Sequence, residues 1–151
     1  MKKSNAIKQI NDLHAALRNL FRHSYADMVP EGLTPVEGKF IGYIGDHQDE
    51  PGGLISRDLT DDFGLRKPTV SEILASLIKK GYIQFVKDRE DGRMKSIVLT
   101  EKGRDYYDAA SPIMEGFDCS FNDALTEEEQ KQFEAISKKL LTAIKERSKK
   151  K

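Results

Sequence analysis

The sequence predicts a mostly α-helical protein of the α+β class with one β-hairpin. Apolar residues recur at spacings of three and four in the segments that begin and end the chain, which is the periodicity of amphipathic helices. Two short runs of β-favouring residues, "YIQFV" and "IVLT", flank the charged segment "DREDGRMKS" at residues 88–96. Because 151 residues is near the usual size of one domain, we expect residues 1–151 to form a single domain.

Two helices are predicted in the N-terminal third of the chain. The first covers residues 5–27, and the second begins at Pro35, because Thr34 and Glu37 have the spacing of a capping box. The apolar residues of the second helix are expected to point inward: Val36, Phe40, Ile41 and Ile44. Its glycines recur at spacings of four and three: Gly38, Gly42 and Gly45. They predict either that another element packs closely against this helix or that the helix is weak.

Two further helices are joined by a tight turn. The first is expected to start with Ser56 as its N-cap and to end at Gly64, and the second carries Pro68 in its first turn and stops at Gly81. The second helix has an apolar face that we expect to be buried: Val70, Ile73, Leu74, Leu77 and Ile78. Helices joined by so short a turn must cross at a steep angle.

A β-hairpin and two helices follow. The strands are predicted at residues 82–87 and 96–100, after which Thr100 can cap a long helix. Pro112 is expected to kink or break that helix near residues 108–112. A second capping box, Thr126 with Glu129, opens the last helix.

Charge is uneven along a chain whose net charge is zero. Residues 66–104 contain ten basic and five acidic residues, so the remainder carries the compensating negative charge. Such a distribution can present a directional positive field to a partner. The alternative is that the charges are merely scattered over solvated faces.

Several classes of protein and site are not indicated. No apolar run approaches the roughly 20 residues that cross a bilayer, and the N-terminus is polar, so we expect a cytoplasmic protein with no membrane partner. The single Cys119 cannot form an internal disulfide. His14, His23 and His47 are too dispersed for a metal site, and we expect no cofactor. Motifs of nucleophilic, phosphate-binding and metallopeptidase catalysis are missing from the sequence, which argues against an enzyme.

The order of elements is that of a winged helix-turn-helix with helical extensions at both ends. The chain resembles the multiple-antibiotic-resistance regulator (MarR) family over nearly its whole length, most specifically at residues 65–103. Four motifs carry the resemblance in order: Pro68-Thr69-Val70, Lys80-Gly81, the wing Asp88-Arg89-Glu90-Asp91-Gly92-Arg93, and Leu99-Thr100 with Gly103. The resemblance implies a DNA-binding lobe at residues 34–100 and a helical dimerisation region at residues 5–27 and 105–147.

The resemblance also implies that the helix opened by Pro68 reads double-stranded DNA. A helix fits the major groove, and residues near its N-terminus point at base edges. We expect DNA contacts from the following residues of this segment: Arg66, Lys67, Pro68, Thr69, Ser71 and Glu72. Lys67, Thr69 and Ser71 would face bases and Arg66 a phosphate. Alternatively, Thr69 and Ser71 only favour the start of a helix.

The resemblance also implies that the charged tip of the hairpin contacts DNA. Arg93 matches the family position that enters the minor groove, where narrow stretches attract arginine. Asp91 can pair with a wing arginine, and Arg89 and Lys95 are placed for phosphates. The alternative is a solvated turn whose charges only prevent edge-to-edge pairing of strands.

Two residues depart from the family pattern. Arg66 stands where a small capping residue is common, so the cap must come from elsewhere or be missing. Glu72 stands where arginine, glutamine or asparagine is more usual, and a carboxylate there repels phosphate but can accept a hydrogen bond from cytosine N4.

The resemblance finally implies a homodimeric repressor on a pseudo-palindromic operator. The apolar stripes of the terminal helices exceed the need of a small winged domain, although they could instead complete a monomeric core. Members of the family respond either to small-molecule effectors, often aromatic or anionic, in the crevice between the dimer helices and the lobe, or to thiol oxidation, and the sequence leaves both alternatives open. Cys119, between Phe117 and Phe121, is expected to be a buried thiol rather than a redox sensor. A competing hypothesis, favoured by the neutral pI and by Glu72, is a winged-helix protein-interaction module without specific DNA binding.

Overall fold

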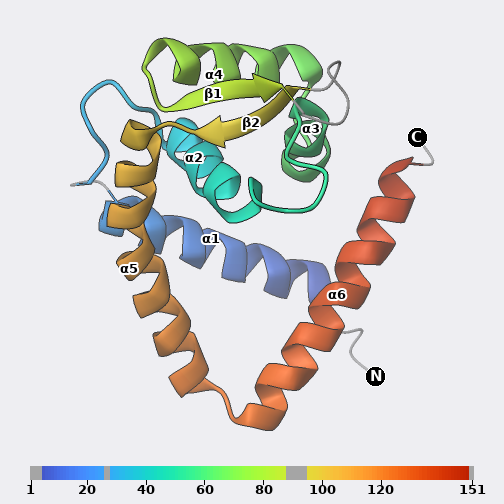
Figure 1. Ribbon diagram of the computed structural model, residues 1–151. Coiled ribbons are helices and arrows are strands. Elements are labelled where there is room, and N and C mark those ends of the chain that lie inside the picture. Colours follow the sequence, from blue (N-terminus) through green and yellow to red (C-terminus); the bar gives the residue numbers. More distant parts are fainter. Residues whose placement is uncertain (1–4, 26–27, 88–94, 150–151) are drawn as a thin grey trace. The chain divides into compact units, whose positions relative to one another are not determined.

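The computed structural model describes residues 5–25, 28–87 and 95–149 (Figure 1). Its elements, in chain order, are α1 (Ala6–Tyr25), α2 (Pro35–His47), α3 (Ser56–Phe63), α4 (Lys67–Lys79), β1 (Ile83–Lys87), β2 (Lys95–Leu99), α5 (Glu101–Ala124) and α6 (Glu127–Lys149). The mostly helical α+β class is therefore confirmed. The chain divides into two compact units, residues 1–111 and 112–151, each described by itself below.

The core of the first unit lies among α2, α3, α4 and the hairpin. Its buried hydrophobic residues are Leu33, Phe40, Ile41, Ile44, Leu54, Leu59, Val70, Leu74, Leu77, Tyr82, Ile83, Ile97 and Leu99. The rings of Phe40 in α2 and Phe63 in α3 lie 4.5 Å apart between centroids. Burial of this much apolar surface is the main force that fixes the three helices against the sheet.

The start of α2 is capped as predicted. The Thr34 hydroxyl accepts from the Glu37 N–H at 3.3 Å, and the Glu37 carboxylate accepts from the Thr34 N–H at 2.8 Å. Val36, however, is 39% exposed, so its predicted burial is wrong. At about 100° per residue it lies roughly a quarter turn from the centre of the buried stripe, which consists of Glu37, Phe40, Ile41 and Ile44.

Two glycines of α2 receive aromatic rings from the first turns of α5. A Cβ at Gly38 would lie 2.8 Å from the Tyr106 hydroxyl oxygen, and one at Gly45 would lie 2.3 Å from the Tyr107 ring. The predicted close approach is confirmed at these positions. At Gly42, by contrast, a Cβ would meet nothing within 4 Å.

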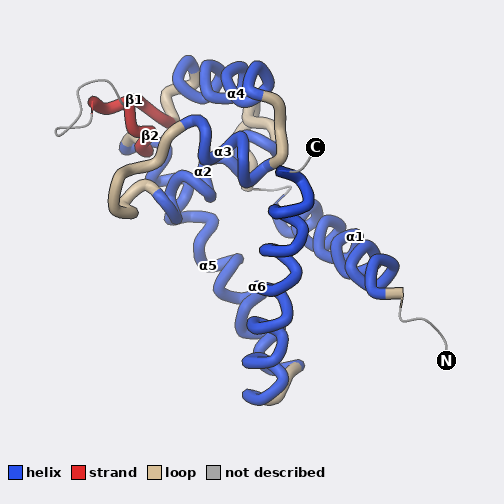
Figure 2. Tube along the Cα trace, turned by 90° about the vertical axis from the view of Figure 1, so that its right-hand side faces the viewer, coloured by secondary structure: helices blue, strands red, loops and turns tan. Residues whose placement is uncertain are grey.

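The start of α3 differs from the prediction. Ile55 is the N-cap, and its N–H donates to the Asp58 carboxylate at 2.9 Å, so Ser56 is already helical and caps nothing. The end is as predicted, because Gly64 has φ of 61°, a left-handed conformation that suits glycine. Only Leu65 and Arg66 separate Gly64 from α4, as Figure 2 shows in the short tan segment between the two helices.

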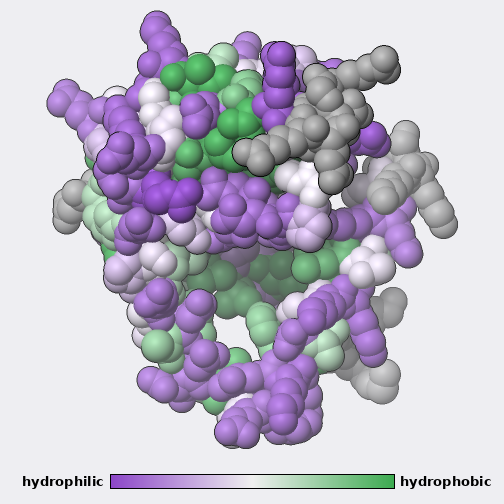
Figure 3. Space-filling view, in the orientation of Figure 1, coloured by the Kyte–Doolittle hydropathy of each residue, from purple (hydrophilic) through white to green (hydrophobic). Residues whose placement is uncertain are grey.

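The buried face of α4 is narrower than predicted. Val70, Leu74 and Leu77 are buried and Ile73 is half-buried, but Ile78 is 41% exposed. Ile78 lies at the edge of the stripe, one residue before the helix ends. Hydrophobic surface is visible over α4 and β1 in the space-filling view (Figure 3).

The hairpin is antiparallel, with Ile83 opposite Leu99 and Lys87 opposite Lys95, close to the predicted strands. Two hydrogen bonds extend it toward the helices. The Ile97 N–H donates to the Leu54 carbonyl at 2.7 Å, and the Leu99 N–H donates to the Gln48 side-chain carbonyl at 2.9 Å. The base of the wing is therefore anchored to the segments that leave α2 and enter α3.

The long helix α5 begins at a Thr100 cap, since the Gly103 N–H donates to the Thr100 hydroxyl at 3.1 Å. It does not break near Pro112, which lies inside a continuous helix of 24 residues. Loss of one backbone donor leaves the other hydrogen bonds of such a helix in place, so the predicted break is wrong, whereas the alternative outcome, a kink, stays a prediction. The boundary between the two compact units nevertheless falls immediately before this proline.

The second unit contains the end of α5 and all of α6. The predicted capping box of α6 is confirmed, because Thr126 and Glu129 exchange backbone-to-side-chain hydrogen bonds of 2.9 and 3.2 Å. Five large hydrophobic residues of α6 are exposed in the single chain: Phe133, Ile136, Leu140, Leu141 and Ile144. Among the helices of the described residues, none contains a stretch long and apolar enough to cross a membrane.

Candidate nucleic-acid interface

The first turn of α4 presents an uncapped helix end. Arg66 is the N-cap, with extended backbone angles of −70° and 146°, and its side chain makes no capping hydrogen bond. The cap that the sequence left in question is therefore missing. Pro68 has no N–H, while the N–H groups of Lys67 and Thr69 have no acceptor within the helix. Free N–H groups and the positive end of the helix dipole make this turn suitable for an anion.

The side chains of the same segment point away from the core. The structure brings together six of the residues singled out from sequence, all of them exposed: Arg66, Lys67, Pro68, Thr69, Ser71 and Glu72. Val70, between Thr69 and Ser71, is only 1% exposed. This single buried residue fixes which side of the turn faces solvent, so the hydroxyl groups of Thr69 and Ser71 are displayed rather than packed.

The helix before this turn is held against α2. In addition to the contact between Phe40 and Phe63, the Tyr43 hydroxyl of α2 donates to the Asp62 carboxylate of α3. Burial, followed by that hydrogen bond, raises the pKa of Tyr43 above its ordinary value, so the phenol stays protonated and remains a donor. The two helices that precede the Gly64 turn thus form a fixed support for α4.

The far end of α4 is held by a buried carboxylate. Glu37 is 4% exposed and accepts from the Ser76 hydroxyl at 2.6 Å and from the Lys80 ammonium at 2.9 and 2.7 Å. Burial by itself would raise the pKa of Glu37, but hydrogen bonds from Lys80, Ser76 and Thr34 outweigh it and lower the pKa to about 2. The carboxylate is therefore ionised throughout the neutral range.

Sequence reasoning found only half of this cluster. The capping role of Glu37 was visible from the three-residue spacing to Thr34. Its contacts with Ser76 and Lys80 span 39 and 43 residues, a separation at which no local pattern operates. The one available signal was that Glu37 falls within the stripe of buried residues on α2, where a charged side chain requires a partner.

The wing residues are only partly described. Lys95 is exposed at the start of β2, on the strand that the Leu54 and Gln48 hydrogen bonds anchor. Arg89, Asp91 and Arg93 lie outside the described residues. Their contacts with DNA and the pairing of Asp91 with an arginine therefore stay predictions from sequence.

Two other expectations concern Cys119 and metals. Cys119 is exposed in the single chain, so its predicted burial is wrong. Two residues along a helix amount to about 200° of rotation, which places Cys119 on the opposite side of α5 from half-buried Phe117. Within the described parts of the chain, no group of three or more His, Cys, Asp or Glu could hold a metal ion.

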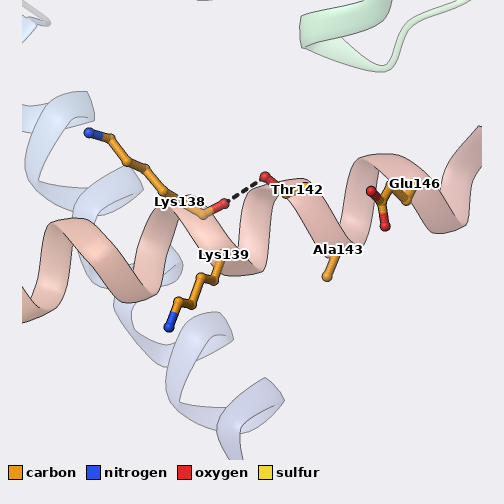
Figure 4. A pocket seen from close by; sticks show the side chains of 5 residues that line it. All are labelled: Lys138, Lys139, Thr142, Ala143 and Glu146. Carbon is orange, nitrogen blue, oxygen red and sulfur yellow. Dashed lines mark hydrogen bonds between the residues drawn. The ribbon is translucent and has the colours of Figure 1, made fainter.

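A surface depression of about 400 Å³ lies along α6 (Figure 4). Its lining residues are Lys138, Lys139, Thr142, Ala143 and Glu146. The Thr142 hydroxyl donates back to the Lys138 carbonyl at 3.0 Å. All five residues lie on one helix, and one helix cannot enclose a ligand in the way that small-molecule sites do. The effector site implied by the family resemblance therefore stays a prediction.

Comparison with known proteins supports the assignment that the motifs suggest. Residues 31–94 match the sequence model of the MarR family. An uncharacterized HTH-type transcriptional regulator of Bacillus cereus is 34% identical over 99 residues, which cover 65% of this chain and 63% of that protein. The chain thus aligns with less than two thirds of the length of this curated relative.

Solved structures match over almost the whole chain. The S. aureus MepR protein in a MepR-DNA complex is 25% identical, covers 94% of this chain and 99% of its own, and has a TM-score of 0.73. A MarR/EmrR family transcriptional regulator from Acinetobacter sp. ADP1 is 27% identical, covers 93% and 95% of the two chains, and has a TM-score of 0.74. Together with the winged-helix fold and the family-model match, these similarities show that the chain resembles MarR-family regulators in both sequence and fold.

Proposed function

We propose that this protein is a sequence-specific double-stranded DNA-binding transcriptional regulator that acts as a homodimer. The observation that carries the proposal is the first turn of α4, where six consecutive or near-consecutive polar, charged or proline residues are exposed on a helix anchored in the core. Regulators of the MarR family are DNA-binding transcription factors and not enzymes, and MepR was solved in a DNA complex.

The proposed contacts follow from the chemistry of this turn. The N–H groups of Lys67 and Thr69 and the side chain of Arg66 suit phosphate oxygens, which set the register of a protein on DNA. Thr69 and Ser71 then lie at the depth of base edges in the major groove, where a hydroxyl can donate or accept. Glu72, one helical turn after Pro68, would discourage phosphate and favour a cytosine N4 donor.

The wing completes the proposed grip. We assign Arg93 to the minor groove and Arg89 and Lys95 to flanking phosphates, with Asp91 holding a wing arginine in place. The support is the family motif in the sequence and the anchored base of the hairpin. Under this assignment, the basic side chains at the start of α4 and in the wing bind the same DNA duplex.

Homodimerisation is supported by exposed apolar faces on the terminal helices. In α1, Ile7 is 68% exposed and Leu13 is 50% exposed, and in α6 the exposed fraction of Phe133 reaches 57%. Such faces require a partner surface in water. A two-fold dimer would place two α4 helices on half-sites about one helical turn of DNA apart, which corresponds to a pseudo-palindromic operator.

We further propose repression as the output and release by a small-molecule effector, on the family resemblance. Binding of an effector to a state that cannot span both half-sites would lower operator affinity by shifting the population away from the DNA-competent dimer. Addition of candidate aromatic or anionic compounds to a preformed operator complex tests this part, and release of DNA at compound concentrations that leave the dimer intact supports it.

Selection from a random pool of duplex oligonucleotides tests the central proposal. The expected result is enrichment of an inverted repeat, with an affinity that falls by roughly 0.9 log units per phosphate contact for each log unit of salt. The Thr69→Ala protein should select altered bases within each half-site while keeping its non-specific affinity. A protein-interaction module would enrich no duplex at low salt, and that result would refute the proposed function.

A further inference from the structure

The two ends of α4 are held in different ways. At the N-terminal end no side chain caps the helix, and the residues proposed to read DNA are exposed. Toward the C-terminal end, Ser76 and Lys80 both bind the Glu37 carboxylate, at distances between 2.6 and 2.9 Å. The orientation of the N-terminal end of α4 therefore depends on the packing of Val70 and on the contacts that Ser76 and Lys80 make at the other end of the same helix.

Glu37 is bound from two directions at once. Its carboxylate accepts from the Thr34 N–H at 2.8 Å, which fixes it to the first turn of α2, while Ser76 and Lys80 approach from α4. It is the one buried charged residue among the described residues. Hydrogen bonds to a buried carboxylate are directional and cannot be exchanged for water without cost, so they define one geometry more narrowly than apolar packing does.

Ser76 and Lys80 are four residues apart and lie one above the other on the same side of α4. Two anchor points on one side of a helix fix its rotation about its own axis as well as its position along that axis. Thr69 lies seven residues before Ser76, roughly 10 Å along the helix at 1.5 Å per residue. A rotation released at Ser76 and Lys80 is therefore transmitted directly to the side chains that face the groove.

We propose that Glu37 is a positioning residue for base reading: through Ser76 and Lys80 it sets the rotation of α4 that aims Thr69 and Ser71 at base edges. This inference rests on the proposed DNA-binding function. Contacts to bases require correct side-chain direction, whereas flexible cationic side chains reach phosphates from many geometries. Loss of the Glu37 contacts should therefore weaken specific binding and spare non-specific binding.

Glu37→Gln is the informative substitution. Glutamine keeps the shape of the side chain and an acceptor for the Thr34 N–H, but it removes the charge that pairs with Lys80. Long-range electrostatics alone predicts tighter binding to DNA, because a negative charge is lost. Mispositioning predicts the opposite for the selected operator, a loss of about tenfold or more, which is the size of the effect of one mismatched base pair.

The measurement is a pair of titrations of the folded dimer, one on the selected operator and one on a scrambled duplex, at the same salt and well below the unfolding temperature. The Glu37→Gln protein should lose about tenfold in the ratio of the two affinities, with non-specific affinity within about twofold of wild type. Lys80→Met should lower the same ratio, whereas Lys79→Met, which removes the same charge from an exposed neighbour, should not. Should Glu37→Gln prove poorly folded, Ser76→Ala removes one hydrogen bond and is expected to lower the ratio to a smaller extent.

The outcomes separate the positioning role from the function on which it rests. An unchanged ratio in folded Glu37→Gln and Ser76→Ala proteins overturns the positioning role and leaves the cluster purely structural. A wild-type protein that prefers no duplex removes the proposed function, and with it this inference. Equal losses in the affinity ratio for Lys80→Met and Lys79→Met also overturn the positioning role, because they would show that charge and not orientation governs specific binding.

Discussion

Lowering the pH from 7 to 3 should destabilise the wild-type protein by about 2 kcal/mol through Glu37 alone. The folded-state pKa of this buried carboxyl is about 2, against an ordinary value of 4.5. A depressed folded pKa contributes stability that is fully present above the unfolded pKa and is lost as the pH falls through the folded one. The whole contribution is therefore about 3 kcal/mol, and roughly two thirds of it should be gone at pH 3.

Urea unfolding at a series of pH values measures this contribution, provided that the protein concentration is fixed, since dimerisation would add a concentration dependence. The Glu37→Gln protein lacks the titration, so the stability gap between wild type and variant should narrow by about 2 kcal/mol between pH 7 and pH 3. Glu134→Gln is the matched control. Glu134 pairs with Lys138 on the exposed surface of α6, and its gap should change little. A gap for Glu37→Gln that stays constant down to pH 3 would refute the assigned hydrogen bonds.

Three further outcomes are expected. Leu77→Ala removes a fully buried side chain and should lower the free energy of unfolding by about 2–5 kcal/mol in urea titrations. Gly45→Ala places a methyl group 2.3 Å from the Tyr107 ring and should destabilise by about 1–3 kcal/mol, whereas Gly42→Ala meets nothing and should stabilise α2 by up to about 1 kcal/mol. Arg93→Ala should weaken operator binding in a gel-shift titration with an unchanged unfolding midpoint, and equal affinity would remove the wing from the proposed grip.

Local features were predictable because their causes are local. The capping boxes at Thr34 and Thr126 and the left-handed glycines Gly64 and Gly81 involve residues within a few positions of one another, so the sequence displays the whole interaction. The start of α3 shows the limit of that approach. Ser56 is a favourable capping residue, yet Asp58 binds the Ile55 N–H and moves the helix start by one residue.

The same distinction holds within the candidate site. That Thr69 and Ser71 would be exposed followed from the helical period with Val70 inward, and the structure places them so. The partners of Glu37 could not be predicted from the sequence, because the choice of partner depends on how α2 and α4 cross. The predicted burial of Cys119 was wrong for a related reason. Its neighbours in sequence are aromatic, but on a helix the residues two positions away lie on another face.

Among the residues that the structure describes, buried hydrophobic side chains are concentrated in the proposed DNA-binding lobe and are missing from the helices proposed to join two copies. All of the buried hydrophobic residues in the described chain lie between Leu33 and Leu99. The helices α1 and α6 contribute none to that set, although four large apolar residues of α1 and five of α6 are 40% exposed or more. A core that is complete without them fixes the shape of the lobe, including the direction of α4. The proposed dimer would then set the spacing and mutual orientation of two DNA-binding lobes whose own shape is already fixed. An effector that acts on the terminal helices would change operator affinity without altering the base preference of either lobe.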